Sequence, residues 1–252
     1  MNSFLKSLLV FVLLTAAGFS ADDFAETKKK AEAADATAQT ILGNKYYQGE
    51  GAPKDITEAL KWWRLAAEQG HSFSQFMLGY VYYQGEGVLK DNAEAVKWWR
   101  KAADQGAAVA QYELGRMYND GTSVPKDIAQ AVKWFRKAAD QGNAGAQNNL
   151  GVKYDNGQGV PKDYAEAVKW YRMAAEQGNT IAQVNLGGMY GKGHGVPKDL
   201  VQAHVWWNIA GANGNEDAKK NLAIAEKRMT DSQKEKAMDL ARELFAKLPK
   251  GE

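Results

Sequence analysis

The sequence predicts an all-α protein, a right-handed α-solenoid built of helix–turn–helix repeats. Three observations support this prediction. The chain repeats itself every 36 residues, tryptophan and glycine fall at fixed positions of the repeat, and each repeat contains two segments with helical periodicity. One pair of short helices cannot bury its own apolar face, so successive pairs have to stack on one another.

Five consecutive repeats account for most of the 252 residues, and tryptophan marks them most clearly. The repeats are residues 35–70, 71–106, 107–142, 143–178 and 179–214. One column is always tryptophan: Trp62, Trp98, Trp134, Trp170 and Trp206. The next column is always aromatic: Trp63, Trp99, Phe135, Tyr171 and Trp207. Glycine keeps the same period, with 19 of the 25 glycines in four columns, so we interpret both residue types as parts of packing and turns.

Each repeat is predicted to contain two helices. In the second repeat, the apolar spacing predicts a helix over Ser74 to Gln84 that ends at Gly85. The second helix is expected to begin after Asp91, because an Asp before a helix accepts hydrogen bonds from its unpaired amides. It is expected to end at Gly106, a residue type that readily takes the left-handed conformation of a helix stop.

The two ends of the array are predicted to be capping segments. Residues 21–34 resemble a degenerate second helix, and residues 215–252 continue the repeat before departing from it. Thr230 and Gln233 form the pattern of a capping box at the start of a last helix, Asp231 to Lys247. We expect this helix to turn five residues inward: Met238, Ala241, Leu244, Phe245 and Leu248.

The first 20 residues have the pattern of a secretory signal peptide. Lys6 precedes a ten-residue apolar run from Leu8 to Ala17, and Gly18 and Ser20 are small residues placed for cleavage before Ala21. The apolar run is shorter than the roughly 20 residues that a membrane-spanning helix needs. We therefore expect a periplasmic or secreted protein, without a membrane span after cleavage.

Composition and motifs argue against several functions. Lys and Arg total 32 against 30 for Asp and Glu, which leaves no basic surplus for nucleic-acid binding. The absence of cysteine excludes disulfides and cysteine chemistry. His71, His194 and His204 share no helical face and are expected at the surface. Nucleophile-elbow, phosphate-loop and Lys-Thr-Gly motifs are missing, so we expect no enzyme, metal or cofactor.

The repeat pattern resembles that of the Sel-1-like repeat family, which is similar to tetratricopeptide repeats. The pattern is Ala-Gln-x-x-Leu-Gly-x-x-Tyr-x-x-Gly-x-Gly-Val-x-x-Asp, then Ala-x-x-Trp-x-x-x-Ala-Ala-x-x-Gly, and residues 146–178 match it without a gap. The match covers residues 38–214, about 70% of the chain. The resemblance implies a scaffold for protein–protein interaction whose first helices line a concave face, and exported bacterial members are implied in signalling, envelope regulation or contact with host proteins.

The repeated columns are explained by packing, so we expect the binding residues among the variable positions of the first helices. The candidates are Asn44, Tyr47, Phe76, Tyr80, Tyr83, Gln84, Tyr112, Arg116, Asn119, Asn148, Asp155 and Asn156. Aromatic rings with adaptable polar neighbours suit an extended peptide or protein segment. The same aromatic residues also have an interpretation as packing between neighbouring first helices.

Two other functions stay open on the sequence alone. An envelope glycan such as peptidoglycan is the alternative ligand, with Tyr47, Tyr83 and Tyr112 stacking on sugar rings. The other, less favoured, function is that of a hydrolase. Since both ends of the array are capped, we expect a monomer.

Overall fold

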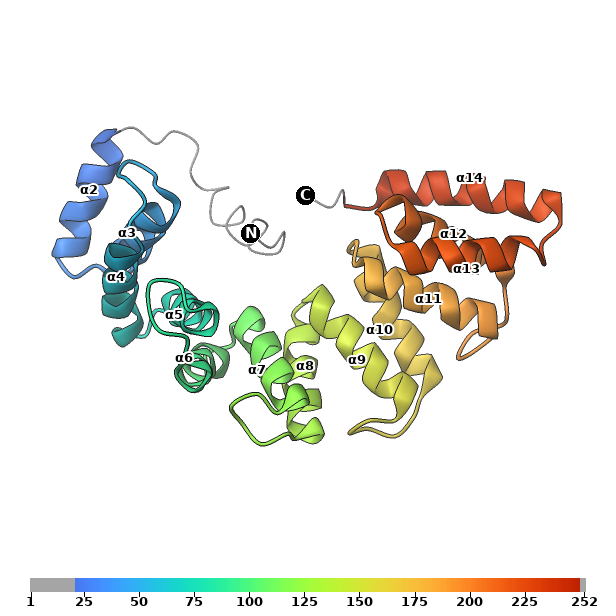
Figure 1. The fold of residues 1–252 in the computed structure, drawn as a ribbon, viewed down its shortest axis with the longest axis horizontal. Coiled ribbons are helices and arrows are strands. Elements are labelled where there is room, and N and C mark those ends of the chain that lie inside the picture. The colour runs from blue at the N-terminus through green and yellow to red at the C-terminus, as the bar shows by residue number, and fades with distance from the viewer. Residues whose placement is uncertain (1–20, 250–252) are drawn as a thin grey trace. The chain divides into compact units, whose positions relative to one another are not determined.

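The computed structural model describes residues 21–249, and the predicted signal peptide at residues 1–20 lies outside them. The described chain forms thirteen helices and no strand, which confirms the all-α repeat fold (Figure 1). The first helices of the five repeats are α3 (Ala36–Gln48), α5 (Ser72–Gln84), α7 (Ala108–Asp120), α9 (Ala144–Asn156) and α11 (Thr180–Lys192). The second helices are α4 (Ile56–Glu68), α6 (Asn92–Asp104), α8 (Ile128–Asp140), α10 (Tyr164–Glu176) and α12 (Leu200–Ala212). The terminal helices are α2 (Ala21–Glu32), α13 (Glu216–Glu226) and α14 (Asp231–Lys247).

The helices form two compact bodies, and the boundary between them in the sequence falls between Lys126 and Asp127. In the N-terminal body, each helix from α2 to α7 packs against the next one along the chain. In the C-terminal body the same succession runs from α8 to α13, and α14 packs against α12 (Figure 1). Within each body, the helices from α2 to α7 and from α8 to α13 are therefore held by neighbours in sequence, as a stacked-repeat fold requires.

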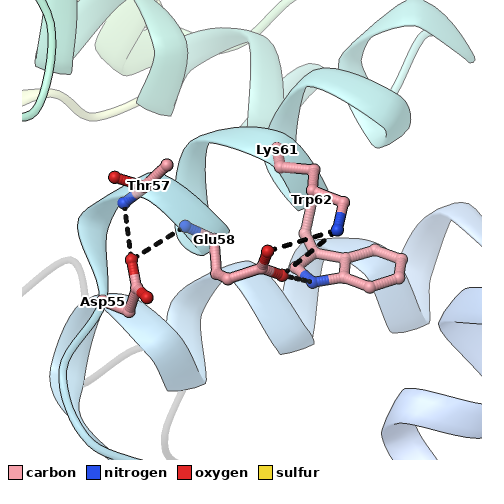
Figure 2. A network of polar contacts seen from close by, with 5 residues as sticks. All are labelled: Asp55, Thr57, Glu58, Lys61 and Trp62. Atoms are coloured by element: carbon pink, nitrogen blue, oxygen red, sulfur yellow. Dashed lines mark hydrogen bonds and ion pairs between the residues drawn. The ribbon is translucent and has the colours of Figure 1, made fainter.

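Local signals define where the helices begin and end. Each first helix stops at a glycine in the left-handed conformation, for example Gly85 with φ 76°. Each second helix begins after an Asp whose side chain accepts from backbone amides. Figure 2 shows this cap at α4, where Asp55 accepts from the amides of Thr57 (2.9 Å) and Glu58 (3.0 Å). Glu58 in turn accepts from the indole Nε1 of Trp62 (3.0 Å), so the cap and the repeated tryptophan are linked.

The second aromatic column fills the space between the two helices of a repeat, and glycine in the first helix makes room for it. Trp99 is 1% exposed. A Cβ atom at Gly79 would lie 2.4 Å from Cδ1 of Trp99, closer than any side chain can approach. The same contact joins Gly187 to Trp207. The columns that the sequence assigned to packing are therefore packed as expected.

Three further columns, of Gln, Arg and Tyr, connect one repeat to the next by hydrogen bonds. Gln75 donates through Nε2 to the carbonyl of Ala67 in the preceding second helix (3.0 Å), and Gln147 and Gln183 do the same in the C-terminal body. Arg172 of α10 donates to the hydroxyl of Tyr190 in α11 (2.7 Å). The repeated Gln, Arg and Tyr side chains thus satisfy polar groups at the junctions between repeats.

The C-terminal cap agrees with the sequence prediction in its limits but only in part in its orientation. Helix α14 begins with the predicted capping box, in which Thr230 and Gln233 bond each other's backbone amides. Ala241 is buried, but Met238 is 42% and Phe245 43% exposed, so the expectation that both face inward is wrong. Ala237 is buried instead, while the predicted Leu244 and Leu248 pack partly buried against the same core.

Candidate binding surface on the first helices

The structure buries four of the twelve predicted binding residues. These are Asn44, Tyr47, Phe76 and Asn148, with 2–7% of each residue exposed. The carbonyl oxygen of the Asn44 amide accepts from Nε1 of Trp63 (2.9 Å), and Asn148 accepts from Nδ2 of Asn185 (3.1 Å). Their side chains are engaged in packing, so they support the surface from beneath.

Tyr47 shows how completely such a residue is fixed. Its ring lies 5.3 Å from that of Trp63, and its hydroxyl donates to Glu86 of the next repeat (2.8 Å). Burial, together with this hydrogen bond, raises the pKa of Tyr47 well above its usual value. For Tyr47 the packing interpretation of the aromatic residues therefore describes the structure.

Four of the predicted binding residues lie partly exposed on α5 and α7 of the N-terminal body, and we call them the tyrosine cluster: Tyr80, Tyr83, Tyr112 and Arg116. All four are half-buried. The ring of Tyr83 lies 5.4 Å from that of Trp99, and the ammonium of Lys90 lies 5.3 Å from the Tyr83 ring centre. The cluster therefore presents aromatic surface that is already held in place.

Glu113, which the sequence analysis did not single out, anchors the charge of this cluster. Its carboxylate pairs with Nη1 of Arg116 (2.9 Å), and only 13% of its side chain is exposed. Burial raises the pKa of Glu113, and the charge and hydrogen bond of Arg116 oppose the rise. Burial lowers the pKa of Arg116, but Glu113, Tyr112 and Tyr83 more than offset this, so the guanidinium stays charged. Glu113 lies one residue before the repeated Leu114, in a variable column outside the predicted binding set.

The remaining predicted residues lie at the ends of first helices. In the N-terminal body Gln84 is exposed, and Asn119 is half-buried and donates to the carboxylate of Asp120 (2.8 Å). In the C-terminal body Asn156 is exposed, and Asp155 accepts from the hydroxyl of Tyr171 at 3.5 Å.

In the C-terminal body α9, α11, α12 and the α13 segment up to Arg228 line an open pocket of about 350 Å³. Gly188 and Gly191 lie at its wall, in the columns that carry Tyr80 and Tyr83 in the N-terminal body. Asn221, Ile224 and Arg228 also line it. These three lie in the segment predicted to be a cap. Ile224 and Arg228 follow Gly188 and Lys192 by one repeat, so extending the register of the repeat would have identified them.

The histidines take no part in a metal site within residues 21–249, where no group of three or more potential ligands gathers. The expectation that all lie at the surface is wrong for His204, which is 1% exposed with Nε2 3.2 Å from Glu226. The cap segment α13 covers it. His71 contacts Thr40 (3.0 Å), and His194 stacks on Tyr164. None of the thirteen described helices has the length and apolar character to cross a membrane.

The repeats and this geometry define a family. The sequence profile of the Sel1 repeat matches residues 36–71, 72–106, 108–143, 144–179 and 180–215, so the chain belongs to the Sel1 repeat family. Proteins built of these repeats generally act as scaffolds for protein–protein interaction.

Several relatives are known. The chain is similar to a Sel1 repeat protein from Oxalobacter formigenes, with 33% identity, a TM-score of 0.74, and coverage of 89% of this chain and 99% of that one. It is also similar to c5321, a protective antigen of uropathogenic Escherichia coli with an SLR fold, with 33% identity, a TM-score of 0.65, and coverage of 98% and 62%. A 67-residue stretch is 42% identical to the secretory immunoglobulin A-binding protein EsiB of Escherichia coli O6:H1. The chain thus spans 62% of the c5321 structure, and the EsiB match covers 14% of that protein.

Proposed function

We propose that this protein is an exported scaffold that binds a segment of a partner protein on the first helices of its N-terminal body. The observation that carries the proposal is the tyrosine cluster. Its four residues vary between repeats, while the repeated side chains around them are used by packing. A surface that differs from repeat to repeat on a uniform frame is suited to recognise a particular partner.

The chemistry of the cluster favours a polypeptide. Tyrosine and arginine are enriched among residues that dominate binding energy at protein interfaces. Tyr83 and Tyr112 can offer apolar area with little loss of side-chain freedom, because neighbouring groups already restrict them. Arg116 adds a permanent charge with several donors, which suits peptide carbonyls and carboxylates.

The proposal includes export and a partner outside the cytoplasm. The pattern of residues 1–20 supports export. The likeness of one stretch to an immunoglobulin-binding protein supports an extracellular protein as the partner, and makes secretory immunoglobulin A a defined first probe.

The test combines two probes: purified secretory immunoglobulin A and a displayed library of random peptides, each followed by affinity measurement on the mature chain. The double variant Tyr83→Ala/Tyr112→Ala is expected to weaken binding by about tenfold or more, since each ring is a large contact. The control, Leu65→Ala/Met173→Ala, changes two side chains that are 39% exposed on second helices and is expected to bind normally.

Two results would contradict the proposal. One is wild-type affinity in the tyrosine double variant. The other is an absence of any polypeptide ligand, together with cosedimentation on protease-treated peptidoglycan that the double variant loses, which would favour the glycan alternative.

A further inference from the structure

We propose that the pocket of the C-terminal body binds a bulky apolar side chain lying next to a carboxylate in an extended peptide. This inference rests on the proposed function, because it assumes that the ligand is a polypeptide. It adds a second site to the tyrosine cluster and states the chemistry that this site selects. Three properties of the pocket carry it: its hollow, its charge and its amides.

Glycine creates the hollow. A Cβ atom at Gly188 would meet no other atom within 4 Å, so this position opens directly onto free space. At Gly191 a Cβ atom would lie 3.1 Å from Cη2 of Trp207, which shows that the indole forms the wall there. Leu200 and Ile224 complete an apolar lining, and Ile224 is 58% exposed. The volume of about 350 Å³ lies within the usual range of ligand pockets and has room for one large apolar side chain.

The charged groups at the pocket favour an anion. Lys192 and Arg228 both line it, and both are exposed. Neither makes an ion pair with any group in residues 21–249. Asp155 is the opposing charge, and its carboxylate accepts from the hydroxyl of Tyr171. Among residues 21–249, two cations without an ion pair lie with one carboxylate that is already hydrogen-bonded. The site is therefore complementary to a ligand carboxylate, which an arginine binds in a two-pronged arrangement.

Two amides at repeat-equivalent positions point to an extended backbone as the part of the ligand between the side chain and the carboxylate. Asn185 and Asn221 line the pocket one repeat apart. Asn185 donates to Asn148 and keeps its carbonyl oxygen for another donor. A side-chain amide both donates and accepts, so it can pair with the amide and carbonyl of a peptide unit.

The carboxylate has two chemical sources, a free C-terminus or an Asp or Glu side chain, and three peptide pools separate them. Each pool consists of fluorescein-labelled octapeptides with six random residues. The first ends in Ser-Leu with a free carboxylate, the second in Asp-Leu-amide, and the third in Ser-Leu-amide. Fluorescence polarisation with the mature chain is expected to show binding about tenfold tighter for the first or second pool than for the third.

Two variants assign the binding to this pocket. Lys192→Gln/Arg228→Gln is expected to remove the advantage of the carboxylate-bearing pools, while the control Lys198→Gln/Lys219→Gln removes the same charge outside the pocket and is expected to retain it. Gly188→Leu places a side chain in the hollow and is expected to abolish binding of every pool. Because leucine is a better helix former than glycine, Gly188→Leu should keep or raise the thermal unfolding midpoint, which separates blocked binding from misfolding.

The results distinguish this inference from the proposed function. Equal binding of all three pools, absence of binding by any of them, or normal binding by Gly188→Leu overturns the pocket assignment. If secretory immunoglobulin A or displayed peptides still bind through Tyr83 and Tyr112, the scaffold function stands and only the inference fails. If no polypeptide binds at all, both fail.

Discussion

The tyrosine cluster and the C-terminal pocket occupy the same columns of the repeat, three repeats apart. Tyr80 and Tyr83 in α5 correspond to Gly188 and Gly191 in α11. The frame beneath them is unchanged, since Gly79 contacts Trp99 as Gly187 contacts Trp207. One frame thus carries an aromatic surface in one body and a hollow in the other. Repeated residues therefore build the scaffold, and differences between repeats build its surfaces.

Removing a buried indole from each body should have the largest effect on stability, and it tests whether the frame is equivalent in the two bodies. Trp99→Ala and Trp207→Ala each remove a buried indole and should each cost about 3–5 kcal/mol of unfolding free energy. Urea unfolding followed by circular dichroism measures both. A cost below about 1 kcal/mol at either site would show that the frame differs between the bodies.

A smaller difference in stability should distinguish a packed glycine from a surface glycine within one helix. Gly187→Ala in α11 places a Cβ atom 2.6 Å from Nε1 of Trp207 and should destabilise by about 1–3 kcal/mol. Its neighbour Gly188 opens onto free space, so Gly188→Ala should stabilise by about 0.5–1 kcal/mol through helix propensity. Thermal unfolding of the two variants compares them directly. The same sign of effect at both positions would contradict the assignment of Gly188 to the surface.

Burial of Glu113 beneath the tyrosine cluster should make the stability of the N-terminal body depend on pH. Because the pKa of Glu113 is raised on folding, the folded chain holds this proton to higher pH than the unfolded chain does. The contribution of Glu113 to stability therefore falls as pH rises from about 4.5, its usual pKa, through the raised value, and is constant beyond it.

Glu113→Gln should flatten this part of the profile, because glutamine does not titrate. Urea unfolding between about pH 4 and 8 measures the difference between the two chains. Glu216→Gln is a suitable control, since Glu216 is exposed and pairs with exposed Lys219. Identical profiles for wild type and Glu113→Gln would show that Glu113 titrates alike in the folded and unfolded chain.

The smallest expected effect concerns the one repeat whose loop departs from the glycine column. Ser123 takes the left-handed conformation with φ 58°, where its counterparts are glycines such as Gly87 at 71°. Ser123→Gly should relieve this conformation and stabilise by up to about 1 kcal/mol, without changing partner binding. A stability loss in a thermal melt would show that the serine side chain makes a contact that offsets the strain.

Much of the fold was predictable because its signals are local and repeated. The glycine stops, the Asp caps and the last helix, Asp231–Lys247, follow from short patterns in the chain. The faces of the helices were less predictable. Met238 and Phe245 share a stripe with Ala241, and periodicity identifies the stripe without fixing how far it turns toward α12.

The candidate site was only partly predictable for the same reason. Variable columns indicated where recognition residues lie, but burial of Tyr47 and Phe76 depends on contacts with neighbouring helices. The pocket was missed because it is formed by missing side chains at Gly188 and Gly191 and completed by a segment interpreted as a cap. Hollows of this kind arise from packing in three dimensions and leave little trace in a column of residues.

Side-chain footprinting with hydroxyl radicals shows whether a partner binds on the first helices or on the second helices. A bound polypeptide ligand is expected to protect Tyr80, Tyr83 and Tyr112 on the first helices. Leu65 and Met173, each 39% exposed on second helices, should react equally with and without ligand. Protection of Leu65 or Met173 with unchanged reactivity of the three tyrosines would show that the uniform second helices bind the partner, and would contradict the account.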